Sequence, residues 1–121
     1  MTEQEVFNAV YARLYDGKGQ ASNNSGHCLY ETPDGNHCAV GIFLKDCSEA
    51  VRDFKGSIEG LLINFYDKLP SVVLQHERLL QMLQRVHDRH SNWDGNKFVG
   101  HEQLEAVAKR YNLEMPEGAQ S

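Results

Sequence analysis

Two cysteines and two histidines flank a strong turn signal in the first third of this 121-residue sequence. His27 directly precedes Cys28, His37 directly precedes Cys38, and the segment 28–40 reads CLYETPDGNHCAV. Thiolates and imidazoles are zinc ligands, and a thiolate beside an imidazole is a nucleophile. The segment is therefore a metal site, a redox pair, a nucleophile, or a hairpin in which the cysteines are small buried apolar residues.

The chemistry of the turn decides which of these side chains share a face. Pro33, Asp34 and Gly35 suit successive positions of a type I turn followed by a glycine bulge. That geometry pairs Thr32 with Asn36 across the hairpin. Counting outward from this pair predicts one shared face for Cys28, Tyr30, Cys38 and Val40. It predicts the opposite face for His27, Leu29, His37, Ala39 and Gly41.

This count weakens the metal and redox interpretations. Cys28 and Cys38 become diagonal neighbours, about 7 Å or more apart at Cα, which is too far for a relaxed disulfide. His27 and His37 point away from the thiols, so a zinc site with all four ligands would need a register slip. We therefore predict no metal and no cofactor, and we interpret both cysteines as buried apolar residues. A reactive thiol remains the alternative.

A second constellation of polar residues lies between His76 and His90. His76 and His87 share a helical face but are about 16 Å apart, so they cannot hold one metal. His87 and His90 could, but no third ligand is specified. If the hairpin packs against this helix end, His87 could serve as the base for Cys28 or Cys38 in a thiol-dependent enzyme. The competing interpretation is a core-edge histidine satisfied by a backbone carbonyl.

If the chain has a binding site, we predict it where the hairpin meets the end of the long helix. Gly41 ends the hairpin without a side chain, which permits close backbone approach or tight packing. An aromatic ring, two imidazoles and a carboxylate gather at the helix end and give the amphipathic lining that pockets use: Trp93, His87, His90 and Asp88. The alternative is that Trp93 and His87 only seal the core.

The elements that must position these residues are mostly helices. Apolar residues at helical spacing predict helices over 3–15, 57–66, 72–90 and 101–112. Thr2 with Glu5 forms a capping-box pattern, and Ser57 and Ser71 are candidate N-caps. We predict loops over 16–26, 45–55 and 91–100, with a turn rather than a calcium loop at Asp94. The fold class is thus α+β, mainly helical, with one β-hairpin packed against about four helices.

Length and composition limit the partners. A chain of 121 residues predicts one domain over 1–115, followed by a flexible tail over 116–121. The net charge of −5 argues against a clustered Lys/Arg face, so we expect no nucleic acid as partner. No apolar run is long enough for a signal peptide or a membrane span, so we expect a cytoplasmic protein that binds no membrane. The sequence leaves the oligomeric state open.

The hairpin and the long helix together resemble a known family. The segments are Cys28-x-Tyr30, Asp34-Gly35-x-x-Cys38-Ala39-Val40-Gly41 and Leu83-Gln84-x-Val86-His87-Asp88, followed by Trp93. They are similar to short uncharacterised proteins of bacteriophages and their hosts, over about residues 3–113. Ile42 stands where other members often have a cysteine. The resemblance implies a helical domain with a hairpin, in a phage or mobile-element setting, and no established activity.

These observations lead to two hypotheses of function. The first is a small non-catalytic accessory protein of a phage or mobile element, located in the host cytoplasm. It would bind a host protein or sequester a small signalling molecule, for example in counter-defence. The second is a thiol-dependent enzyme that uses Cys28 or Cys38 with His87.

Overall fold

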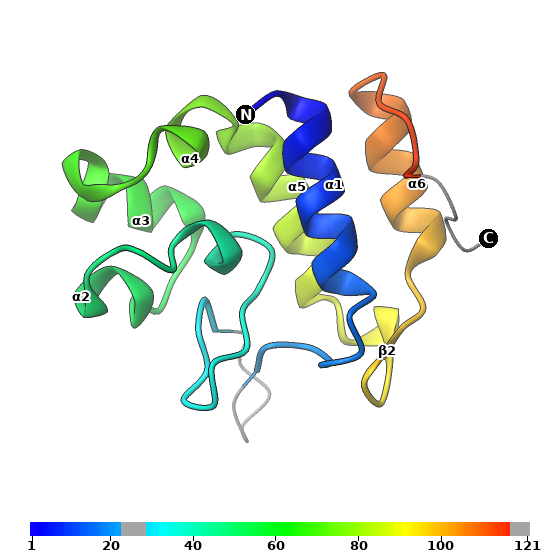
Figure 1. Ribbon diagram of the computed structural model, residues 1–121, viewed down its shortest axis with the longest axis horizontal. Coiled ribbons are helices and arrows are strands. Elements are labelled where there is room, and N and C mark those ends of the chain that lie inside the picture. Colours follow the sequence, from blue (N-terminus) through cyan, green and yellow to red (C-terminus); the bar gives the residue numbers. More distant parts are fainter. Residues whose placement is uncertain (23–28, 117–121) are drawn as a thin grey trace.

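The protein is mainly helical, as the computed structural model shows for residues 1–22 and 29–116 (Figure 1). Its helices are α1 (Glu3–Leu14), α2 (Glu49–Arg52), α3 (Ile58–Phe65), α4 (Ser71–Gln75), α5 (Glu77–Asp88) and α6 (His101–Arg110). Short 3₁₀ turns are η1 (Gly41–Phe43), η2 (Tyr66–Lys68) and η3 (His90–Asn92). Strands β1 (Trp93–Asp94) and β2 (Lys97–Phe98) form an antiparallel pair. The predicted mainly helical α+β fold is confirmed.

The core forms around α5, which packs against both α1 and α6. After the β1–β2 pair, α6 runs back alongside α5, so the two helices are antiparallel (Figure 1). Each helix contributes an apolar stripe at helical spacing, as burial of an amphipathic helix requires. The buried residues of these stripes are Val6, Phe7, Val10 and Leu14 on α1, Leu79, Leu80, Leu83 and Val86 on α5, and Leu104, Val107 and Ala108 on α6.

Two predicted helix starts are confirmed by their caps. The Glu5 backbone N–H donates to Thr2 Oγ1 at 3.1 Å, and the Thr2 N–H donates to Glu5 Oε1 at 2.8 Å, which completes the capping box of α1. Ser57 Oγ accepts the Gly60 N–H at 3.1 Å and caps α3. At the next predicted start, Pro70 rather than Ser71 occupies the cap position, because Ser71 is already helical.

The single helix predicted over 72–90 is wrong, because it is broken at His76 into α4 and α5. His76 has φ −121° and ψ 31°, outside the helical region, and its ring nitrogen Nε2 lies 2.7 Å from the Met1 carbonyl oxygen. The apolar stripe passes through the break because a one-residue interruption hardly changes the spacing of the apolar positions. The sequence pattern therefore could not reveal it.

The strand pair also lies elsewhere than expected. The segment 28–40 was predicted as the hairpin, but the described part of it forms only one isolated bridge, between Glu31 and His37. The ladder is instead β1–β2, within the predicted loop 91–100. The turn expected at Asp94 is confirmed: Gly95 has φ 61° in the two-residue loop that joins Asp94 to Lys97.

Two other predicted segments are the loop over 45–55 and the tail over 116–121. The predicted loop 45–55 contains the short helix α2. The predicted tail 116–121 lies outside the described residues from position 117 onward. Within the described part, the Glu114 N–H donates to Gln4 Oε1 at 2.9 Å, which ties the segment after α6 to α1.

Candidate functional site

The predicted turn is present and places Cys38. The Gly35 N–H donates to the Thr32 carbonyl at 2.9 Å, and the Thr32 N–H donates to the Asn36 carbonyl at 2.8 Å. Gly35 has φ 86°, the left-handed conformation that the bulge requires. The Cys38 N–H approaches the Tyr30 carbonyl at 3.4 Å, so the predicted register holds as far as this pair. Both side chains are buried, as the face assignment predicted.

Beyond Cys38 the predicted strand ends. Val40 has helical dihedral angles (φ −80°, ψ −37°), so the prediction that the strand includes Val40 is wrong. The Val40 N–H instead donates to Gln84 Oε1 on α5 at 3.0 Å. Cys28 itself lies outside the described residues, as does His27. The chain thus leaves the hairpin to pack against α5, which was the condition for bringing the two predicted constellations together.

Gly41 is required by close backbone approach. A Cβ atom added there would lie 1.8 Å from the Tyr30 carbonyl oxygen, so no side chain fits. The Gly41 N–H donates to Cys38 Sγ at 3.3 Å, which closes the turn after the hairpin. Gly41 is buried, so the close approach of the Tyr30 backbone serves packing within the protein.

The Cys38 thiol is placed as a core residue. Its side chain is 0% exposed, and burial raises its pKa to about 12, with the nearby Asp88 carboxylate adding to the rise. Because the thiolate is the nucleophilic form, Cys38 carries almost none at neutral pH. Cys47 is partly exposed, and burial also raises its pKa. The thiol-enzyme hypothesis therefore finds no support at Cys38, and its other candidate, Cys28, lies outside the described residues.

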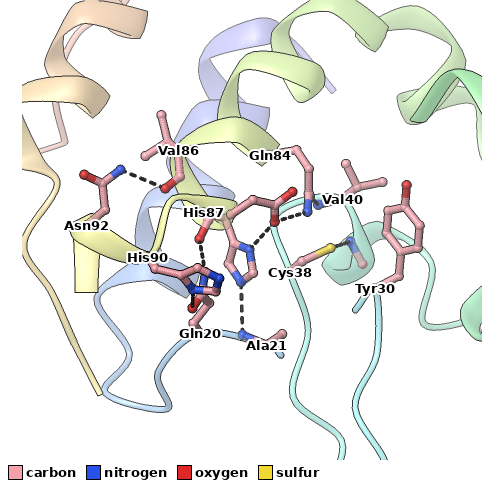
Figure 2. A network of polar contacts seen from close by, with 12 residues as sticks. Gln20, Ala21, Tyr30, Cys38, Val40, Gln84, Val86, His87, His90 and Asn92 are labelled. Carbon is pink, nitrogen blue, oxygen red and sulfur yellow. Dashed lines mark hydrogen bonds and ion pairs between the residues drawn. The ribbon is translucent and has the colours of Figure 1, made fainter. Parts of the chain in front are cut away.

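His87 is fully buried and hydrogen-bonded on both ring nitrogens (Figure 2). Nε2 accepts the Ala21 backbone N–H at 3.1 Å, and Nδ1 lies 2.8 Å from Asp88 Oδ1. Since Nε2 is an acceptor, the ring proton resides on Nδ1 and faces the carboxylate. Burial lowers the pKa of His87, although the adjacent Asp88 acts in the opposite direction. The imidazole is a neutral bridge between α5 and the 20–21 segment. The sequence predicted a backbone carbonyl as its partner, but the backbone partner is the Ala21 N–H.

Gln84 connects this bridge to the hairpin side (Figure 2). Its Nε2 donates to Asp88 Oδ1 at 2.8 Å, while its Oε1 accepts the Val40 N–H. The same side-chain amide therefore links the carboxylate beside His87 to the backbone after Cys38. The helical pattern over 72–90 places Gln84 on the polar face, opposite the apolar stripe. Its role was missed because a single glutamine gives no signal of its tertiary partner.

The loop after α5 is hydrogen-bonded to the C-terminal end of this helix. Trp93 Nε1 donates to the His87 carbonyl at 2.8 Å, and the Asn92 amide donates to the Val86 carbonyl at 2.9 Å. These bonds satisfy carbonyls at the C-terminal end of α5, where no helical N–H follows. His90 Nδ1 lies 2.8 Å from Gln20 Oε1 at the surface. Trp93 thus seals the core edge as well as lining the surface.

The predicted site residues lie close together, but they differ in solvent exposure. His87, Asp88, His90 and Trp93 surround the end of α5, and Gly41 joins them through the Val40–Gln84 contact. His87 and Gly41 are buried and Trp93 is partly buried; His90 is exposed, and the Asp88 side chain is 40% exposed. Without rearrangement, a ligand could reach His90, Asp88 and the exposed part of Trp93, but not His87 or Gly41. Binding at this corner stays a prediction.

A second feature at this helix end was not predicted. A groove of about 610 Å³ lies between α5 and α6, within the range of about 300–1,000 Å³ typical of ligand sites. It is lined by Met82, Arg85, Val86, Arg89, Asn92, Gln103, Ala106, Val107, Lys109 and Arg110. We name it the α5–α6 groove. Apolar side chains form its floor, cations form its rim, and none of these described lining residues is acidic or aromatic.

The cations of the rim are largely uncompensated. Within the described part of the chain, no ion pair or side-chain hydrogen bond involves Arg85, Arg89 or Arg110. Lys109 approaches Glu105 at 3.6 Å, in a pair exposed on both sides. A protein of net charge −5 thus gathers four positive side chains around one hollow. The expectation that Lys and Arg form no cluster is wrong locally, because net charge carries no information on distribution.

The described residues hold no group of three His, Cys, Asp or Glu side chains suited to a metal ion. Among the helices of residues 1–22 and 29–116, none has the length and apolar content needed to span a bilayer. Comparison of the chain with protein-family models, curated proteins and solved structures gives no match. The resemblance to short phage proteins therefore stays a prediction, and the functional argument depends on the geometry of this chain.

Proposed function

We propose that this protein is a non-catalytic binding protein, and that its ligand site is the α5–α6 groove. One observation carries the proposal: uncompensated cations surround an apolar floor in a hollow large enough for a ligand. Side chains without partners keep their charge available, and an apolar floor such as Met82 and Val107 gains from being covered. The groove therefore suits a ligand that is both apolar and anionic.

The buried polar residues support the same conclusion. Cys38 and His87, the residues with the most obvious chemistry, are fully buried and occupied by internal hydrogen bonds. His87 holds the 20–21 segment against α5, and Cys38 closes the turn after the hairpin. This arrangement favours a rigid scaffold for the groove over a thiol-dependent enzyme. The biological role would be that of an accessory protein of a phage or mobile element, and this setting depends on the family resemblance alone.

An anionic apolar dye tests the proposal directly. Anilinonaphthalene sulfonate should bind the native protein with enhanced fluorescence, and the double variant Arg89→Glu/Arg110→Glu should weaken binding about tenfold, equivalent to about 1.4 kcal/mol. Added salt should weaken binding to the wild type for the same reason. Both positions are exposed, so the variant should fold normally.

The matched control is Arg78→Glu/Lys68→Glu. It makes the same change in net charge at two exposed residues that do not line the groove. Dye binding to this control should equal that of the wild type. If both double variants lost binding equally, or if neither did, the cations of the groove would not bind the dye and the proposed site would be wrong.

A further inference from the structure

The residues that line the α5–α6 groove indicate which kind of anionic ligand would bind there. The floor is made by side chains of both helices: Met82, Val86, Ala106 and Val107. Val86 and Val107 are almost fully buried, whereas Ala106 is exposed. The alanine side chain is so small that the backbone of a partner can approach it closely. Methionine adapts its shape to different apolar partners. Such a floor favours aliphatic side chains.

The shape of the groove is linear, because it lies between antiparallel helices. From Met82 to Arg89 it follows α5 for about 10 Å, or two helical turns. Since α6 runs in the opposite direction, Arg89 lies toward the Gln103 end and Lys109 with Arg110 toward the Met82 end. Positive charge therefore stands at both ends of an apolar strip. An α-helix, about 10 Å across, can lie along such a strip as a third helix.

We infer that the occupant is an amphipathic α-helix of a partner protein, with an aliphatic stripe and acidic residues at both ends of that stripe. This inference depends on the proposed function and specifies its ligand. Aliphatic residues at i, i+3, i+4 and i+7 would cover the floor, as in other helix-in-groove complexes. Glu or Asp about two turns apart would face Arg89 at one end and Arg110 at the other. The complementary charges would fix the orientation of the helix.

The same observations disfavour nucleotides and nucleic acids. None of the described lining residues is aromatic, so bases would find no stacking surface there. The cations flank an apolar floor instead of following a phosphate backbone. In addition, the net charge of −5 repels a polyanion at long range, whereas a short peptide can benefit from the local cluster.

The test uses a synthetic helix-forming peptide of about 18 residues, with leucines on one stripe and glutamates beside it, labelled for fluorescence anisotropy. It should bind the full chain, and a peptide of the same composition with a scrambled order should not. Arg89→Glu/Arg110→Glu should weaken binding about tenfold, and Ala106→Trp should weaken it by a similar factor by filling the floor. The control Arg78→Glu/Lys68→Glu should bind as the wild type does.

A charge exchange makes the test specific. The double variant Arg89→Glu/Arg110→Glu should bind a peptide in which lysines replace the glutamates better than the wild type does. Circular dichroism should show that each variant keeps its helical content. These controls separate loss of the contact from loss of the fold.

Four results would overturn the inference. If the scrambled peptide bound equally well, charge alone would act and no helix would be recognised. If a single-stranded oligonucleotide bound more tightly than the peptide and lost affinity in the same variants, the partner would be a nucleic acid. If the peptide failed to bind while the dye still bound in the groove, the helix would be the wrong ligand and the proposed function would stand. Failure of both probes would refute both proposals.

Discussion

The C-terminal half of α5 presents two faces that differ in how their polar groups are used. On the face toward the hairpin, Gln84 and His87 each accept a backbone N–H from a distant loop and each contact the Asp88 carboxylate. On the face toward α6, Arg85 and Arg89 have no side-chain partner in the described part of the chain. Residue types that are common in catalytic sites, such as His87, therefore stabilise the fold. The candidate site is formed by arginines, which are common on solvated surfaces. Residue type alone gives the opposite assignment.

The largest expected effect is at Gly41, on the scaffold face. Gly41→Ala should destabilise the fold by about 3 kcal/mol, because its Cβ would collide with the Tyr30 carbonyl oxygen. Gly35→Ala is the comparison, since its φ is 86° but nothing lies within 4 Å of an added Cβ. It should cost only about 1 kcal/mol, through backbone strain. Urea denaturation measures both, and equal losses would show that close packing at Gly41 is not what holds the hairpin.

A smaller loss is expected at His87. His87→Leu keeps an apolar volume in the core but leaves the buried Ala21 N–H without an acceptor, which should cost about 2 kcal/mol. Arg89→Leu, at the C-cap of the same helix and on the groove side, should change stability by no more than about 0.5 kcal/mol. Thermal and urea unfolding test the pair. If Arg89→Leu were the more destabilising variant, the division between scaffold and binding faces would be wrong.

The smallest effect concerns pH. Burial lowers the pKa of His87 in the folded state, so below the ordinary value of 6.5 the unfolded chain binds a proton that the folded chain does not. The stability contributed by His87 is therefore complete above that value and is lost as the pH falls toward the lowered pKa. His87→Gln keeps an acceptor for the Ala21 N–H without this titration.

Urea midpoints compared at about pH 7.5 and about pH 5.5 should thus decline more in the wild type than in His87→Gln. The difference in slope is at most about 1.4 kcal/mol per pH unit for one proton. The other histidines are present in both proteins and cancel in the comparison. Identical slopes would contradict the account, because they would mean that the pKa of His87 is the same in the folded and unfolded states and that Asp88 fully offsets burial.

Local signals in the sequence predicted local structure well. The capping box at Thr2, the N-cap at Ser57 and the turn at Gly35 each depend on a few neighbouring residues, and all three are present. The break at His76 and the two-residue strands at Trp93 and Lys97 were missed. Neither interrupts a periodic pattern for long enough to be recognised.

The sequence predicts only part of the candidate site. The sequence predicted that the hairpin would meet the end of α5, but not that Gln84 would join them. The helical pattern over 72–90 places Arg85 and Arg89 on the polar face, and both are exposed. It could not indicate that Lys109 and Arg110 lie across a groove from them, because that depends on the packing of α6 against α5. Charge distribution in space is a tertiary property.

The measurement that tests the two-face account most directly is a ¹H–¹⁵N NMR titration of the full chain with the acidic amphipathic peptide. The account predicts saturable shifts at Val86, Ala106 and Val107, with little change at Ala21 and Val40. Shifts concentrated at Ala21, Val40 and the exposed His90, with the groove unaffected, would contradict it. They would place binding on the hairpin side of α5, where the sequence first suggested a site.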